Sequence, residues 1–130
     1  MSNNVSNPYT LQSVPSNKDI HFACQAHAAY YQQVTISLNG QTVVFQGSGE
    51  GVPMQTTAGQ LTATINSGSA TSLQVTFQYS RNGAKGPFTL ARVQAPTVTP
   101  GPVALVQITS EDSTDKDDND SYLSIYWLTT

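Results

Sequence analysis

Residues 34–45 read VTISLNGQTVVF, in which an alternating apolar run and a β-branched run flank Asn39-Gly40. Apolar residues at every second position are typical of a half-buried strand, and Asn-Gly accepts the positive φ angles of a type I′ turn. The stretch therefore predicts a β-hairpin. Asn82-Gly83, which follows FQYS, predicts a second turn of the same kind.

The alternating pattern continues along most of the chain, and Gly, Ser and Thr clusters separate the runs. Strands are predicted at residues 20–26, 33–38, 42–46, 60–66, 72–80, 88–95, 103–109 and 121–128. Because no sustained period of 3.6 residues occurs, we expect an all-β fold, an antiparallel β-sandwich of about eight to nine strands. Proline cannot join a central ladder, so Pro96, Pro100 and Pro102 predict a crossing between the sheets.

Length and charge narrow the class of protein. The 130 residues suit one domain, residues 1–130, and 5 basic against 8 acidic residues give a net charge of −3. The basic residues are scattered, which argues against nucleic-acid binding. The start MSNNVSNPYT lacks the basic and apolar regions of a leader, and no run of about 18 apolar residues occurs. We expect a soluble protein without membrane insertion and without a visible cleavable signal peptide, cytoplasmic as made, with release or surface display by another route left open.

The single cysteine, Cys24, cannot form an internal disulfide. It sits in an alternating apolar run, where a buried and unreactive thiol is expected. His21 and His27 are expected to be ordinary strand or loop histidines.

The segment Ser110–Asp120 reads SEDSTDKDDND and lies directly between the apolar runs VALVQI and YLSIYWL. Six of the 8 acidic residues of the chain fall in this acidic segment: Glu111, Asp112, Asp115, Asp117, Asp118 and Asp120. Because a strand follows, both ends of the segment are held at the sheet, and its carboxylates repel one another unless they are protonated or bridged by cations.

The donor atoms of the acidic segment indicate which cation it binds. Carboxylates, the Asn119 amide and hydroxyls suit Ca²⁺ or Mg²⁺, whereas zinc prefers His and Cys, and the segment has neither. Six carboxylates offer about twelve oxygens and one Ca²⁺ takes about six to eight, so two adjacent ions suit the segment better than one. The remaining ligands must come from other parts of the protein.

An EF-hand loop is the main competing motif, with Asp115 as its first residue. Its sixth position is then Asp120, where the sharp turn needs Gly, and its twelfth is Tyr126, where a bidentate Glu is required. The flanking segments are also predicted strands rather than helices. We therefore set the EF-hand aside.

The acidic segment, followed by one strand containing Trp127, resembles the loop S-E-D-G-T-D-x-D-Y-N-D of the bacterial two-calcium fucose/mannose lectins, the LecB-like family. The resemblance extends over Pro15-x-Asn17, the strand to Ala26 and an ungapped stretch to Leu38, whereas the middle of the chain matches only as a strand pattern. It implies a calcium-dependent lectin domain over residues 1–130 that binds fucose- or mannose-containing glycans and forms a homodimer or homotetramer.

The resemblance also implies two Ca²⁺ per subunit. Glu111, Asp115, Asp117 and Asp120 would hold one ion, and Asp117, Asn119 and Asp120 would share the second. The backbone carbonyl of His27 and the C-terminal carboxylate of Thr130 from a neighbouring subunit would complete the coordination. Asp118 stands where the family has an aromatic residue, His27 where it has Asn, and Thr130 where it has Gly.

In such lectins vicinal sugar hydroxyls bind directly to both ions. The resemblance implies the same mode of sugar binding for this chain. The implied sugar contacts are Ala28, Ala29, Asp112, Thr114, Asp115, Asn119, Asp120 and Thr130. Ala28 and Ala29 replace serines and resemble members that favour mannose over fucose. For Tyr30, stacking on a sugar and ordinary packing both stay open.

Two other functions were weighed. A hydrolase with Asp112 or Asp115 as its base would need a separate acid partner, and only Asp19 and Glu50 lie outside the acidic segment. Because no Ser/His/Asp order stands out either, we expect no enzymatic activity. The alternative kept open is a structural calcium-binding adhesion module without monosaccharide binding.

Overall fold

The structure is a computed structural model that describes residues 4–111 and 120–130. These residues form β-strands and one short 3₁₀ helix, η1 (Gly83–Lys85). The strands are β1 (Asn4–Val5), β2 (Tyr9–Leu11), β3 (Asp19–Leu38), β4 (Gln41–Pro53), β5 (Gln55–Thr56), β6 (Thr62–Asn66), β7 (Leu73–Ser80), β8 (Thr89–Leu90), β9 (Arg92–Gln94), β10 (Thr97–Thr99), β11 (Val103–Glu111) and β12 (Ser121–Leu128). No helix in this described part has the length and apolarity needed to cross a membrane.

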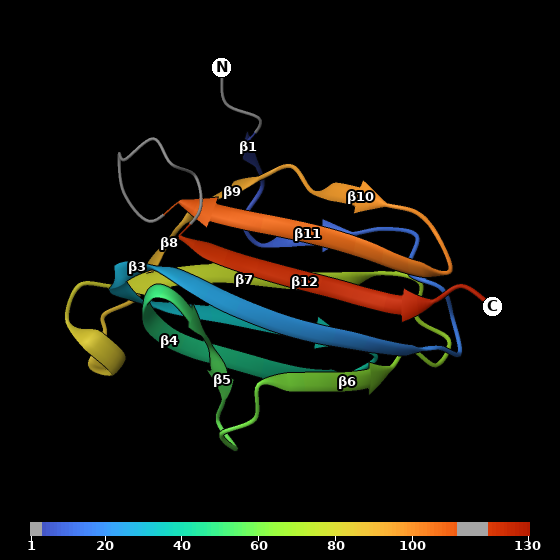
Figure 1. Ribbon diagram of the computed structural model, residues 1–130, viewed down its shortest axis with the longest axis horizontal. Helices are drawn as coiled ribbons and strands as arrows, with labels where there is room; N and C mark the ends of the chain where they lie inside the picture. Colours follow the sequence, from blue (N-terminus) through green and yellow to red (C-terminus); the bar gives the residue numbers. More distant parts are fainter. Residues whose placement is uncertain (1–3, 112–119) are drawn as a thin grey trace.

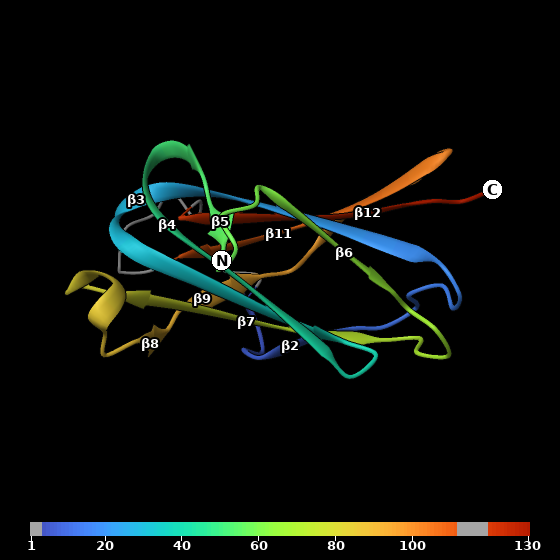
Figure 2. The ribbon, with the colours of Figure 1, turned by 90° about the horizontal axis from the view of Figure 1, so that it is seen from below.

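The predicted antiparallel β-sandwich is confirmed: the strands lie in two layers, which Figure 2 shows edge-on. The first half of β3 pairs with β12 and β6, and β11 and β9 continue that layer. The second half of β3 pairs with β7, which in turn pairs with β2 and β8. β4 follows β3 through both halves. The long strand β3 therefore belongs to both layers (Figure 1).

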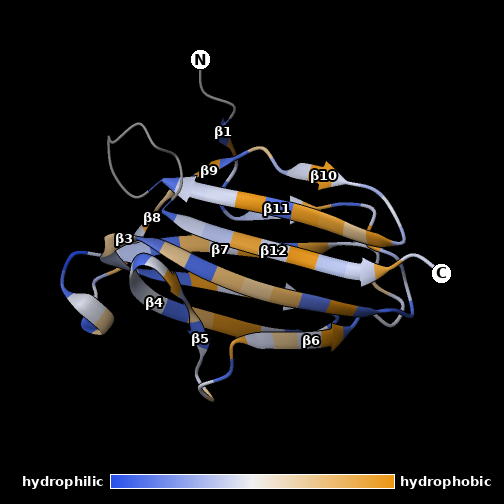
Figure 3. Cartoon of the chain, viewed as in Figure 1, coloured by the Kyte–Doolittle hydropathy of each residue, from blue (hydrophilic) through white to orange (hydrophobic). Residues whose placement is uncertain are grey.

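The core lies between the layers and follows the predicted alternation. Along β3 every second residue is buried, first Ile20, Phe22, Cys24 and Ala26 and later Val34, Ile36 and Leu38. Figure 3 shows apolar and polar residues alternating along the middle of β12, whereas β11 begins with the continuous apolar run 103–106. Burial raises the pKa of the Cys24 thiol well above its ordinary value, which agrees with the predicted unreactive cysteine.

Of the two predicted Asn-Gly turns, one is confirmed and one is wrong. Asn39 and Gly40 have φ angles of 51° and 74° and join β3 to β4 with Leu38 opposite Gln41. Asn82 instead has a φ of −116°, and the chain passes through η1 before β8 begins. A type I′ turn needs positive φ at both central residues, so β7 and β8 are joined by a longer loop.

The predicted crossing at the prolines is also wrong. β10 pairs with β11 in one layer, so the prolines at positions 100 and 102 belong to a hairpin connection. The chain changes layers at Ala91, between β8, which pairs with β7, and β9, which pairs with β11. Ala91 is buried and its amide donates to the Phe77 carbonyl at 3.0 Å, which ends the pairing on that side.

The described residues form twelve strands where eight to nine were predicted, and the difference comes from short segments, because one merger and one division cancel in the count. The predicted strands 20–26 and 33–38 are one strand, β3, and the predicted strand 88–95 is divided into β8 and β9. Four segments of two or three residues, β1, β2, β5 and β10, were not predicted. Such short strands carry too few residues to show an alternating pattern.

Candidate functional site

The ends of the acidic segment meet at one edge of the β11–β12 pair. Ser110 on β11 lies opposite Ser121 on β12, and the Asp120 amide donates to the Ser110 carbonyl at 2.8 Å. The pairing of β11 with β12 thus holds both ends of the acidic segment at the sheet, as the sequence predicted. β3 lies beside it, because the His27 amide donates to the Asp120 carbonyl at 2.9 Å.

Two carboxylates are buried where the segment leaves the sheet. Glu111 is 1% exposed and Asp120 is 3% exposed. Glu111 is opposite Arg92 in the pairing of β11 with β9. Burying carboxylates is costly unless they are paired, hydrogen-bonded or bound to a cation. Both are hard oxygen donors, so the described part of the site fits calcium.

The neighbouring serines add polar atoms to this buried place. Ser110 is 0% exposed, and its hydroxyl has no hydrogen-bond partner among the described residues. The Ser121 hydroxyl donates to Oε1 of Gln32 at 2.9 Å, and Gln32 is itself 0% exposed. The end of the β11–β12 pair is therefore polar inside as well as acidic.

The side chain of His27 contacts Gln25, Glu50 and Tyr122. Its Nε2 lies 3.0 Å from Oε1 of Gln25, its Nδ1 lies 3.4 Å from Oε1 of Glu50, and its ring centroid is 4.8 Å from that of Tyr122. The backbone of His27 meets that of Asp120. This arrangement permits the exchange of the family's Asn for His, since a backbone ligand does not depend on the side chain.

Ala28 and Ala29 lie at a bulge of β3 beside His27. The register with β4 shifts between Ala26 and His27 and again between Ala28 and Gln32. Ala28 is buried, whereas Ala29 is exposed. The Tyr30 ring stacks on Tyr79 at 5.9 Å, and Arg81 lies 5.5 Å from the Tyr30 centroid, so Tyr30 packs against its own protein.

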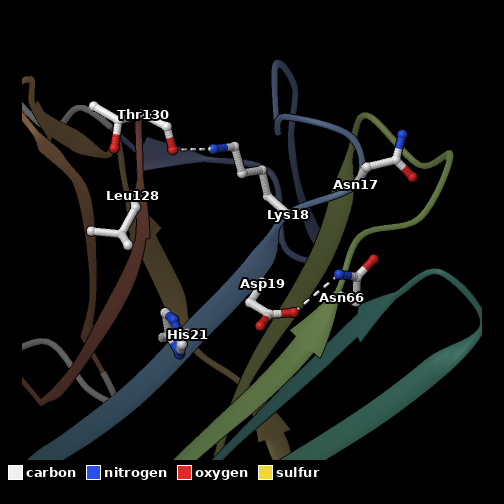
Figure 4. A pocket seen from close by; sticks show the side chains of 7 residues that line it. All are labelled: Asn17, Lys18, Asp19, His21, Asn66, Leu128 and Thr130. Carbon is white, nitrogen blue, oxygen red and sulfur yellow. Dashed lines mark hydrogen bonds between the residues drawn. The ribbon is translucent and has the colours of Figure 1, made fainter.

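Thr130 lies at the opposite end of β12 from Asp120 (Figure 1). Ten residues of extended chain separate them, which corresponds to roughly 30 Å. There the Thr130 carbonyl accepts a hydrogen bond from Lys18 Nζ at 2.8 Å, beside a hollow of about 270 Å³ that Figure 4 shows. A single chain therefore does not bring Thr130 to the carboxylates.

The remaining predicted ligands lie outside the described residues: Asp112, Thr114, Asp115, Asp117 and Asn119. Within residues 4–111 and 120–130 no three His, Cys, Asp or Glu side chains gather where they could hold a metal ion. Of the predicted site, the structure thus brings Glu111, Asp120, His27 and the two alanines together.

Sequence reasoning missed Gln32 and Ser121. The available signal was the alternation along the strand. Gln32 faces inward with Val34, Ile36 and Leu38, where an amide side chain must find buried partners. The partner could not be found from the sequence, since Ser121 is 89 residues away.

Known proteins resemble this chain along nearly its whole length. The model of the family described as fucose-binding lectin II (PA-IIL) matches residues 12–129. No curated protein sequence gives a significant match.

Three solved lectins share the fold. The Chromobacterium violaceum lectin CV2L, in complex with alpha-methyl-fucoside, has a TM-score of 0.73 and 21% identity over 97% of this chain and 100% of its own. The Ralstonia solanacearum high-affinity mannose-binding lectin has a TM-score of 0.67 and 24% identity over 92% and 96%. The C-terminal domain of the BC2L-C lectin from Burkholderia cenocepacia has a TM-score of 0.64 and 21% identity over 98% and 99%.

Proposed function

The chain belongs to the fucose-binding lectin II (PA-IIL) family, and from this membership we propose that its sugar site is a two-calcium platform built on the acidic segment. The protein is a carbohydrate-binding lectin, and its family consists of binding proteins rather than enzymes.

The observation that carries the proposal is the burial of Glu111 and Asp120 at adjoining strand ends. Carboxylates at this depth are stabilised by hydrogen bonds, ion pairs or a bound cation, and Ca²⁺ accepts about six to eight oxygens of this kind. The proposed metal ligands are Glu111, Asp115, Asp117, Asn119, Asp120, the backbone of His27, and Thr130 of a second copy. Bound calcium would supply open coordination positions for two neighbouring sugar hydroxyls.

We infer that the sugar is of the fucose or mannose type. One relative was solved with a methyl fucoside, and another is a mannose-binding lectin. Ala29 is exposed at the bulge beside Asp120, where it would contact the sugar together with Ala28. The other proposed sugar contacts are Asp112, Thr114, Asp115, Asn119, Asp120 and Thr130.

Calorimetry with methyl α-mannoside and methyl α-fucoside tests this assignment. Both should bind in Ca²⁺ and neither in excess chelator, and methyl β-galactoside serves as the control sugar. Calcium at about one hundred times its Kd should also stabilise the fold by about 2.7 kcal/mol, seen as a higher Tm. Calcium binding without a response to any monosaccharide on a glycan array would favour the structural adhesion module, and a Tm indifferent to calcium and chelator would exclude the metal site.

We further propose a homo-oligomer of at least two copies. Thr130 lies roughly 30 Å along the chain from Asp120, so it reaches such a site only in another copy. Exposed apolar side chains lie near it, since Val103 and Leu128 are paired and 46% and 58% exposed. Light scattering should give at least twice the chain mass of 13.9 kDa, and Leu128→Asp should lower it. A monomer that binds sugar fully would contradict the role of Thr130.

A further inference from the structure

Strand β3 is interrupted beside the acidic segment. Ala28 pairs with Gly49 and Gln32 with Gly47, so residues 29–31 of β3 face one residue of β4, Ser48. The pairing with β7 begins only at Tyr31. Among the described strands Tyr30 thus has no register partner, and a partly buried backbone carbonyl at such an interruption is stabilised by a side-chain donor.

The Gln32 side chain provides that donor. Its Nε2 donates to the Tyr30 carbonyl at 3.1 Å, while its Oε1 accepts from the Ser121 hydroxyl at 2.9 Å. Ser121 directly follows Asp120, whose carbonyl accepts the His27 amide. One buried amide therefore connects the bulge to the strand that begins at a proposed calcium ligand.

A glutamine at this position needs a physical reason. Gln32 is 0% exposed and faces the same way as Val34 and Ile36, so an apolar residue would be the simpler choice for the core. Burying an amide is unfavourable unless its donor and acceptor are both satisfied. Here those bonds go to the two sides of the proposed site, rather than both to the sheet interior.

We infer that Gln32 is a positioning residue of the sugar site: it holds the backbone of residues 28–31 at a fixed place relative to Asp120. The bulge carries Ala28 and Ala29, and the Tyr30 ring also stacks on Tyr79. Where sugar is concerned, the inference rests on the proposed function. The anchoring of the bulge does not, because it depends only on the hydrogen bonds described.

Gln32→Met tests the inference, since methionine has a similar length and can neither donate nor accept strongly. In Ca²⁺ the Kd for methyl α-mannoside or methyl α-fucoside should rise about tenfold, the loss that removal of one or two buried hydrogen bonds produces. Hydrogen exchange at the amides of residues 28–31 should quicken by a similar factor. Ser121→Ala removes one of the bonds and should act in the same direction, and the double variant should be little worse than Gln32→Met alone, because both act through one connection.

The matched control is Gln33→Met on the same strand. Gln33 bonds to the Gln78 and Gln46 side chains at 3.2 and 2.6 Å. Gln46 also accepts from the Tyr31 hydroxyl at 3.3 Å, so this network reaches a side chain of the bulge but not its backbone. This variant should lower Tm without changing sugar affinity or exchange at residues 28–31. The inference would be overturned if both variants lost sugar affinity equally, or if Gln32→Met kept wild-type sugar affinity and hydrogen exchange. If Gln32→Met does not fold, the sugar affinity and hydrogen exchange of Ser121→Ala test the inference instead. A wild-type protein that binds neither sugar would overturn the proposed function, while exchange would still decide the anchoring.

Discussion

Glu111→Gln should abolish calcium-dependent sugar binding while the fold is retained. Glu111 is 1% exposed at the end of β11, and glutamine keeps its shape. The carboxylate offers a cation two oxygens and a negative charge, whereas the amide offers one oxygen and an NH₂ group that repels it. We expect calcium affinity to fall by more than about 100-fold, the upper end of what loss of an outer-shell partner costs.

Calorimetry with calcium and then with methyl α-mannoside measures the effect, and circular dichroism in chelator checks the fold. The matched control is Glu50→Gln, whose side chain is 79% exposed and lies 3.4 Å from the His27 ring. It removes the same charge near the site without touching the buried carboxylates, so both affinities should stay within about twofold of wild type. Full calcium affinity in Glu111→Gln would remove this residue from the metal site.

Phe22→Ala should cost about 3–5 kcal/mol of the free energy of unfolding, a large part of what a small domain has. Phe22 is 0% exposed on β3, opposite Ile125 of β12 and Ala63 of β6, where the shared strand enters the core. Removing the ring leaves a cavity, and the surrounding strands close it only in part because β3 is paired on both sides. Urea unfolding in chelator measures the loss without a contribution from calcium.

Leu90→Ala is the control for that truncation. Leu90 is 51% exposed on the short strand β8, so its loss should cost no more than about 1 kcal/mol. Equal costs for the two variants would mean that the core does not centre on β3.

The fold was largely predictable because its signals are local. The alternation over residues 20–26 and the turn at Asn39-Gly40 specify a strand and a hairpin within a few residues. The second Asn-Gly pair misled because its turn depends on where a partner strand begins, and β8 begins only at Thr89. The change of layer lies at Ala91 rather than at the prolines for the same reason, because it depends on which distant strands β8 and β9 pair with.

The candidate site was likewise predictable in its local features and not in its long-range contacts. The acidic composition of the segment and its place between two strands were visible in the sequence, and Glu111 and Asp120 lie at the adjoining ends of β11 and β12. The family resemblance named the His27 carbonyl as a calcium ligand, which stays a prediction, and the structure places the His27 amide against the Asp120 carbonyl. The role of Gln32 was invisible, because an amide in an apolar run gives no indication of its partners.

By itself, then, the sequence determined most of the longer strands, their inward faces and the carboxylates that suit calcium, since period-two alternation and donor chemistry act over neighbouring residues. Only the tertiary structure decided that β3 serves both layers, that a bulge at residues 29–31 lies beside Asp120, and that Thr130 lies at the far end of its own chain. Those features arise from strand pairing and from contacts such as that between Gln32 and Ser121, 89 residues apart, and no local pattern encodes which distant strand a residue will face.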